Sequence, residues 1–113
     1  MDWIKEQLEE AYLDENRIIG SVECVPERLV TIVVERLREK GFKTEIVKTP
    51  SNDFTVVYYQ DCPEEILQLY RKYEESDGDV QVLTAEGHRK LGRAFGYSEE
   101  EIEWFVEEFL GCE

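Results

Sequence analysis

His88 is the only histidine in this chain of 113 residues, so it is the first candidate for catalysis. A histidine that acts as a general base needs an acid or a nucleophile within hydrogen-bond reach. Glu86, Cys62 and Cys24 qualify by residue type alone, because no spacing links them to His88. On a helix, His88 shares a face with the apolar residues three and seven positions later. We therefore expect a histidine packed in the core.

Other reactive or ligating side chains form no recognisable pattern. Cys24, Cys62 and Cys112 are widely separated and form no C-x-x-C pair, which argues against a disulfide framework and a zinc site and favours a reducing compartment. Adjacent acids such as Glu64 and Glu65 follow no calcium-loop pattern. Phosphate-loop, dinucleotide-binding and hydrolase-elbow motifs are absent. We expect no metal, no cofactor and no enzymatic activity.

The acidic C-terminal segment of the chain carries more information about function than any other part of the sequence. Residues 99–113 carry seven carboxylates and no basic side chain. They still form a helical pattern, because an apolar stripe recurs at positions i, i+3, i+4, i+7 and i+8, namely Ile102, Phe105, Val106, Phe109 and Leu110. Ser98 and Glu101 fit a capping box, and Gly111 fits a stop. At about 100° per residue, Trp104 falls opposite this stripe, among glutamates.

Three interpretations of Trp104 are open. It covers another part of this chain or a second copy of it, or it is an exposed contact anchor, since Trp is enriched among interface hot spots and carboxylates steer a basic partner. The third is a misjudged helix boundary. On the second interpretation the main contact surface comprises Glu100, Glu103, Trp104, Glu107 and Glu108. A second acidic patch comprises Glu9, Glu10, Asp14 and Glu15.

The overall charge restricts the partners. Thirteen Lys and Arg against 27 Asp and Glu give a net charge of −14, which is unfavourable for direct binding to DNA, RNA or an anionic membrane. The N-terminus lacks the basic and apolar regions of a signal peptide, and no apolar run approaches the ~20 residues that span a bilayer. We expect a cytoplasmic protein, in the host cytoplasm if its source is viral, with a basic protein partner. A homodimer is left open.

The elements that position these residues follow from periodicity and from turn residues. Helices are predicted over residues 2–13 with Asp2 as N-cap, between Pro26 and Gly41 with Ile32 facing inward, between Pro63 and Gly78, from Thr84 to Phe95, and over the C-terminal segment. Residues 42–48 and 54–60 predict an antiparallel hairpin, in which Ile46 shares a face with Phe42 and Thr44. Residues 17–25 are ambiguous, and residues 80–83 fit a short edge strand.

These elements predict one acidic α+β domain over residues 1–113, in which a β-hairpin, with a third short strand left open, packs with about five helices. The last two helices form a C-terminal helical hairpin. Gly92 in mid-helix costs about 1 kcal/mol relative to Ala, so we expect another element to approach closely there.

A helix-turn-helix DNA-binding interpretation of this hairpin is disfavoured. Arg89, Lys90 and Arg93 lie on the first helix, but the second helix, which normally reads the groove, is the most acidic part of the chain. We expect the three basic residues to balance acids within the fold or to form a small secondary contact.

Two resemblances add to this interpretation. Within residues 88–105, the pattern formed by His88, Leu91, Gly92, Gly96, Tyr97, Ile102 and Phe105 resembles small uncharacterised proteins of phages and archaea. This resemblance implies a prokaryotic or viral source and no particular activity. The second resemblance is one of composition: the size and acidity of the chain are similar to those of DNA-mimic and anti-CRISPR inhibitors.

The sequence thus predicts a non-enzymatic acidic inhibitor or adaptor of a basic, nucleic-acid-binding partner. An immunity or antitoxin protein directed at a basic toxin would use the same electrostatics. The remaining alternatives are an acidic protein without an electrostatic partner and a small enzyme that uses His88.

Overall fold

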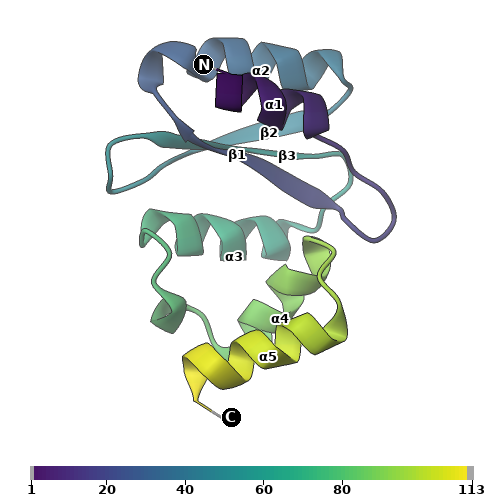
Figure 1. The fold of residues 1–113 in the computed structure, drawn as a ribbon, viewed down its shortest axis with the longest axis vertical. Helices are drawn as coiled ribbons and strands as arrows, with labels where there is room; N and C mark the ends of the chain where they lie inside the picture. Colours follow the sequence, from purple (N-terminus) through teal and green to yellow (C-terminus); the bar gives the residue numbers. More distant parts are fainter. Residues whose placement is uncertain (1, 112–113) are drawn as a thin grey trace.

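A three-stranded antiparallel sheet separates two layers of helices (Figure 1). The computed structural model describes residues 2–111, and of Asp2 only the backbone. On one face of the sheet lie α1 (Asp2–Glu10) and α2 (Val30–Glu39), the latter preceded by the 3-10 turn η1 (Glu27–Leu29). On the other face lie α3 (Glu64–Glu75), the 3-10 turn η2 (Val80–Val82), α4 (Ala85–Ala94) and α5 (Glu99–Leu110). The α+β prediction with five helices is confirmed.

The predicted hairpin forms β2 (Lys43–Lys48) and β3 (Phe54–Tyr59), paired from Lys43 opposite Tyr59 to Lys48 opposite Phe54. The ambiguous segment supplies the third strand, β1 (Ile19–Val25), so that β3 is central in the order β1-β3-β2. The edge strand predicted over residues 80–83 is wrong. Residues 80–82 form a 3-10 turn because the Asp79 side chain accepts a hydrogen bond from the backbone N–H of Gln81 at 2.9 Å.

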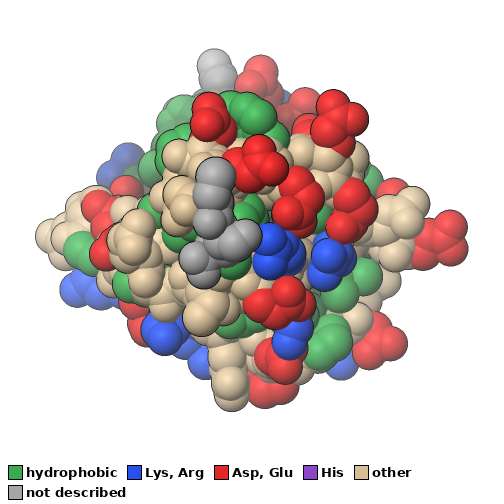
Figure 2. Space-filling view, turned by 90° about the horizontal axis from the view of Figure 1, so that it is seen from below, with side chains coloured by type: hydrophobic (Ala, Val, Ile, Leu, Met, Phe, Trp, Pro, Cys, Tyr) green, Lys and Arg blue, Asp and Glu red, His purple; other side chains and the backbone are tan. Residues whose placement is uncertain are grey.

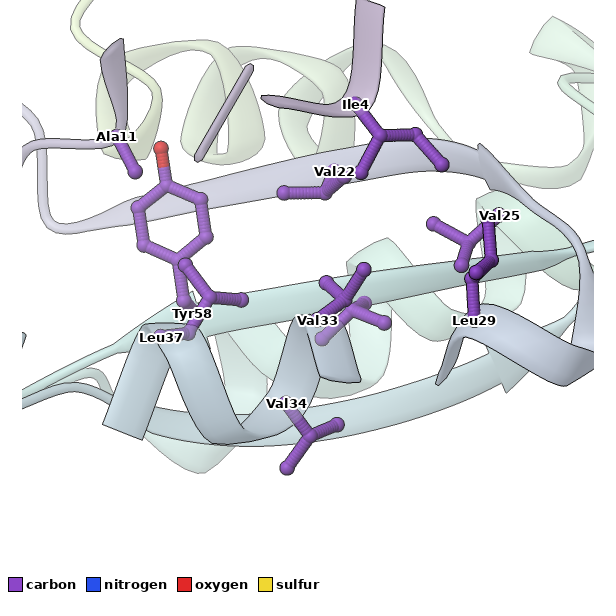
Figure 3. Close-up of a cluster of buried hydrophobic side chains, with 10 residues drawn as sticks. Ile4, Ala11, Val22, Val25, Leu29, Val33, Val34, Leu37 and Tyr58 are labelled. Atoms are coloured by element: carbon purple, nitrogen blue, oxygen red, sulfur yellow. The ribbon is translucent and has the colours of Figure 1, made fainter. Parts of the chain in front are cut away.

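An irregularity in β1 decides which of its side chains reach the core. Val22 pairs with Val56 and Val25 with Phe54, so β1 has one more residue than β3 over this stretch. Cys24 accordingly has a left-handed backbone with φ 58°. Because of this bulge, Val22 and Val25 both lie in the core between the sheet and α1/α2 (Figure 3). Glu23, between them, is exposed.

The central strand serves two cores because both of its faces are apolar. Val56 and Tyr58 pack with residues of α1 and α2, including Ile4, Val33 and Leu37 (Figure 3). Val57 packs on the opposite face with residues of α3 and α4. The sheet is therefore the centre of the molecule.

Several sequence predictions of burial and boundaries are corrected. Ile32 is predicted to face inward and Phe109 to lie on the apolar stripe, but they are 49% and 50% exposed; Ile46, predicted to share a face with Phe42 and Thr44, is 52% exposed. The first helix ends at Glu10, not at residue 13. The Lys40 ammonium donates to backbone carbonyls at that helix end, including those of Leu8 and Ala11, and so satisfies groups that further helical turns would have used. The predicted Asp2 cap concerns a side chain outside the described part.

Candidate partner-binding site

Helix α5 is fixed by its cap and by one narrow apolar face. The capping box is complete, since Ser98 Oγ accepts from the Glu101 N–H at 3.1 Å and a Glu101 carboxylate oxygen accepts from the Ser98 N–H at 2.8 Å. Ile102 and Val106 are buried against α4 and its surroundings. A Cβ on Gly92 would lie 2.9 Å from Ile102 Cγ1, so the predicted close approach at Gly92 is confirmed. These contacts leave the opposite side of α5 free of the core.

Trp104 lies on that free side and is 58% exposed. Its ring meets Phe109 edge to face, with centroids 6.0 Å apart. Within the described residues the chain therefore does not bury Trp104, and the interpretation that the fold itself covers it is wrong. The physical reason is the narrow contact of α5, which packs on α4 with one side only.

The five predicted contact residues differ in their surroundings. Glu100, Glu107 and Glu108 are exposed on α5 beside Trp104. Glu103, by contrast, binds Arg89 of α4, with its two carboxylate oxygens 2.9 and 3.3 Å from the guanidinium nitrogens. Glu103 therefore holds the helical hairpin together and has less charge to offer a partner.

The three basic residues of α4 balance acids within the fold, as expected. Besides the Arg89–Glu103 pair, Arg93 binds Glu99 at 3.0 Å, and Lys90 binds Glu65 at 3.1 Å. The hydrogen bond to Arg93 lowers the pKa of Glu99. Figure 2, which looks onto the end of the molecule where α5 lies, shows acidic side chains around a smaller group of Lys and Arg side chains.

The second predicted patch is divided between α1 and the loop that follows it. Glu9 and Glu10 are exposed on α1, on the opposite side of the sheet from α5 (Figure 1). Asp14 closes a local turn, because its carboxylate accepts from the backbone N–H groups of Asn16 and Arg17, both at 2.8 Å. Glu15 is exposed in the same loop. The structure therefore separates Glu9 and Glu10 from α5, whereas the loop of Asp14 and Glu15 runs toward the end of α4, where the Ile18 N–H donates to the Ala94 carbonyl at 2.9 Å.

A groove beside Trp104 was not foreseen. It has a volume of about 870 Å³ and lies between the C-terminal half of α3, the helix α4 and the first half of α5. Its aromatic lining consists of Tyr70, Tyr73, His88, Phe95, Tyr97, Trp104 and Phe105. Its acidic lining consists of Glu23, Glu74, Asp77, Glu100 and Glu101. No Lys or Arg lines it.

The rings of the groove form two continuous runs. In one, Phe95 lies between Tyr70, at 5.1 Å, and Tyr97, at 6.5 Å between centroids. In the other, His88 lies between Tyr73, at 5.8 Å, and Phe105, at 5.3 Å. Phe105 continues through Phe109 to Trp104. The groove thus has an aromatic wall that ends at the exposed tryptophan.

Glu74 is the most enclosed carboxylate of the groove. It accepts a hydrogen bond from the Tyr70 hydroxyl at 2.6 Å. Burial raises the pKa of Glu74, and the negative charges of Glu23 and Asp77 raise it further against the opposing effect of the Tyr70 hydrogen bond. Burial, followed by the Glu74 charge, also raises the pKa of Tyr73. The groove therefore carries a negative potential that the protein itself does not neutralise.

His88 is packed as the sequence predicted. It is 8% exposed, and its Nε2 lies 2.8 Å from the carbonyl oxygen of Val80. Since a carbonyl only accepts, Nε2 carries the proton. Glu86, Cys62 and Cys24, the candidate partners by residue type, do not line the groove that His88 borders.

The remaining candidates for chemistry stay apart. Cys24 and Cys62 are free thiols, and burial raises the pKa of Cys62 to about 11, with Glu45 and Glu64 adding to the effect. Cys112 lies outside the described residues. Within residues 2–111, no three His, Cys, Asp or Glu side chains gather as metal ligands would. In the same range no helix is both long enough and apolar enough to cross a membrane.

Sequence reasoning missed the groove because its parts come from four elements. Tyr70 and Tyr73 recur at helical spacing, which favours core positions, and the sequence Asp77-Gly78-Asp79 favours a turn. Both descriptions are correct locally, since Tyr70 is buried and Asp77 has a turn conformation with φ 62°. The one signal in the sequence was the excess of acid in residues 61–79, seven acids against two bases, close to two tyrosines.

Comparison of the chain with protein-family models, with curated proteins and with solved structures finds no match.

Proposed function

We propose that this protein is a non-enzymatic binding module that captures a basic protein through α5 and the adjoining groove. The observation that carries the proposal is the exposure of Trp104 between two sets of carboxylates: Glu100, Glu107 and Glu108 on the helix, and those of the groove. A large exposed aromatic ring supplies contact area that carboxylates lack, while the charges attract a basic surface from a distance.

The partner contacts the side of the molecule where α5 lies, and not Glu9 and Glu10 on α1. Because α1 and α5 lie on opposite sides of the sheet, one rigid partner surface cannot meet both (Figure 1). The net charge of −14 adds long-range attraction for any basic partner. Binding of this kind weakens as salt rises, since the Debye length falls from about 30 Å at 0.01 M to about 10 Å at 0.1 M.

The class of partner follows from the same electrostatics. A nucleic-acid-binding enzyme presents Lys and Arg to phosphates, and carboxylates on α5 can occupy such a surface, as in DNA-mimic and anti-CRISPR inhibitors. An immunity or antitoxin protein directed at a basic toxin is the alternative. In either role we place the protein in the cytoplasm, that of the host if its source is viral.

The test is affinity capture from a lysate of the source organism at 0.05 M and 0.5 M NaCl, followed by purification of the captured protein. We expect a basic partner at low salt whose affinity falls on Trp104→Ala and on Glu100→Lys/Glu107→Lys. Glu9→Lys/Glu10→Lys is the matched control, because it makes the same change of charge on the other side of the sheet. Unchanged binding in the α5 variants, or equal loss in the control, would show that this surface is wrong.

The rival explanations give different results in the same experiment. If the acidity serves no electrostatic partner, the low-salt capture retains no protein that high salt would release. Charge reversal at the acidic positions of either surface then has no effect on binding. If His88 is catalytic, the activity of a substrate assay is lost on His88→Gln while partner capture is unaffected.

A further inference from the structure

The groove between α3, α4 and α5 gathers carboxylates from several elements that no basic side chain compensates. Some carboxylates elsewhere are paired: Glu45 with Arg71, Glu65 with Lys90, Glu99 with Arg93 and Glu103 with Arg89. Among the described residues, none of the five carboxylates that line the groove has a Lys or Arg within 4.0 Å. The groove therefore holds five carboxylates without a basic neighbour, an arrangement that is complementary to an external cation.

The aromatic wall determines which cation fits best. A cation over the face of Trp, Tyr or Phe is attracted by the ring quadrupole, and guanidinium groups also stack on rings and bind carboxylates with two parallel hydrogen bonds. The groove offers an arginine both kinds of partner, rings to stack on and carboxylates to pair with. Tyr73, Tyr97 and Trp104 line the same groove as Asp77 and Glu100. An ammonium group lacks the flat surface that stacks, so lysine fits less well.

The size of the groove indicates how much of a partner enters. A volume of about 870 Å³ is comparable with the ~300–1,000 Å³ of pockets that enclose small molecules. A few side chains fill such a space, and a folded domain does not. A second copy of this chain is a poor occupant, because it also carries a net charge of −14.

We propose that the groove binds a short arginine-containing segment of the partner, with arginine side chains stacked on the aromatic wall and paired with the unpaired carboxylates. This inference rests on the proposed function and names the part of the basic partner that is recognised. It assigns to Trp104 two roles: a ring at the end of the groove and a contact on the outer face of α5.

The experiment uses the full chain with Trp3→Phe, so that Trp104 is the only tryptophan and its fluorescence reports occupancy. The probes are three capped peptides of one design, Leu-X-X-Leu-X, in which X is arginine, lysine or citrulline. Citrulline has the shape of arginine without its charge. We expect the arginine peptide to bind about tenfold more tightly than the citrulline peptide, with lysine between them, and with affinity falling as salt rises.

Two groove variants and one control locate the site. Asp77→Asn and Tyr73→Leu change groove residues that lie on α3 and its end, away from α5, and asparagine tolerates the left-handed backbone of position 77. Glu9→Gln/Glu10→Gln removes two charges from α1, on the opposite side of the sheet from the groove (Figure 1), and leaves the groove lining unchanged. We expect the groove variants to lose about tenfold in affinity for the arginine peptide, and the control about twofold at most. Thermal melting confirms that each variant is folded, and Asp77→Asn alone carries the test if Tyr73→Leu does not fold.

Equal binding of the arginine and citrulline peptides, or equal loss in groove and control variants, overturns the inference. So does a dimer in solution that Asp77→Asn dissociates, because a second copy would then occupy the groove. These outcomes are separable from failure of the proposed function. A partner captured through α5 whose binding ignores Asp77→Asn and Tyr73→Leu refutes the groove assignment alone, whereas absence of any salt-sensitive partner refutes the function.

Discussion

At the scale of single residues, the structure gives distinct roles to side chains that are chemically identical in the sequence. Glu103 is paired with Arg89, Glu100 is exposed, and Glu74 is half-buried beside Tyr70. The difference arises from neighbours that are distant in the chain, because burial and charge determine the pKa of a carboxyl. Two predictions belong at this scale.

The first concerns the dependence of stability on pH at Glu74. Burial raises its pKa in the folded state above the ordinary value of 4.5, so its contribution to stability is greatest below that value and is lost as pH rises through the folded pKa. In Glu74→Gln the amide oxygen still accepts from Tyr70, but the buried charge is gone. We expect this variant to be more stable than the parent at pH 7 and to lose that advantage near pH 4, measured by urea unfolding.

Glu107→Gln is the control for Glu74→Gln, because it removes one charge from an exposed position on α5. Equal pH dependence in the two variants would contradict the assignment of the effect to burial at Glu74.

The second prediction concerns Gly20, where no side chain fits. A Cβ there would lie 2.3 Å from Cζ of Tyr58, a ring that is 2% exposed and stacked on Phe42. Overpacking of this kind costs typically about 1–3 kcal/mol, and we expect Gly20→Ala to lose about 3 kcal/mol of unfolding free energy in urea. In the control Gly87→Ala, the new Cβ meets ordinary contacts of 3.4 Å or more, so we expect no loss. Equal effects in the two variants would contradict this explanation.

At the scale of elements, local signals determine where α5 begins and ends, and tertiary contacts determine its orientation. Its beginning and end follow from nearby residues, since Ser98 and Glu101 form the capping box and Gly111 ends the helix with φ 72°. Its orientation depends on Gly92 of α4, which admits Ile102. The groove depends on the capped beginning of α5 as well as on its orientation, because a frayed first turn of α5 would displace Glu100 and Glu101.

The third prediction follows for the cap. Ser98→Ala removes the acceptor for the Glu101 N–H, and loss of such a cap costs typically about 1 kcal/mol. We expect that decrease in unfolding free energy, together with weaker binding of the arginine peptide to the groove. Ser98→Thr keeps a hydroxyl and should retain most of both properties. An uncapped variant with full stability would show that α5 is held by its apolar face alone.

At the scale of the whole molecule, charge is the dominant property. Thirteen basic and 27 acidic side chains give −14, and within the described residues the ion pairs compensate only some of the acids. Net charge far from zero opposes the compact state through self-repulsion, and salt weakens that repulsion.

The fourth prediction is therefore a melting temperature that rises with salt. Between 0.01 and 0.2 M NaCl we expect an increase of about 4–8 °C, the shift that ~1 kcal/mol produces in a domain of similar size. Replacing Glu9, Glu10, Glu107 and Glu108 by Gln changes the net charge from −14 to −10, since four charges are removed, and should reduce the increase. A melting temperature that falls with salt would show that ion pairs such as Arg89–Glu103 outweigh the repulsion.

Much of the secondary structure was predictable because its signals are local. Pro63 precedes α3, Thr84 caps α4 through the Gly87 N–H, and Ser98 caps α5, all as expected. Apart from the strand predicted over residues 80–83 and the end of α1, the errors concern exposure. Ile32 and Ile46 are apolar residues at suitable spacing, but the core between the sheet and α1/α2 is filled by others, such as Val33 and Leu37. Periodicity identifies a candidate face and not the amount of surface that packs against it.

By itself, the sequence determined the five helices and most of their ends, the hairpin, the acidic balance and the position of Trp104 opposite the apolar stripe of α5. Only the tertiary structure decided that β1 joins the sheet, that Trp104 is exposed, that Glu103 is paired, and that two tyrosines of α3 face rings of α4 and α5 across a groove. The physical reason is the distance along the chain over which each interaction acts. Caps, turns and periodicity act over a few residues, whereas burial, ion pairing and the shape of a groove depend on side chains that folding brings together from distant parts of the chain.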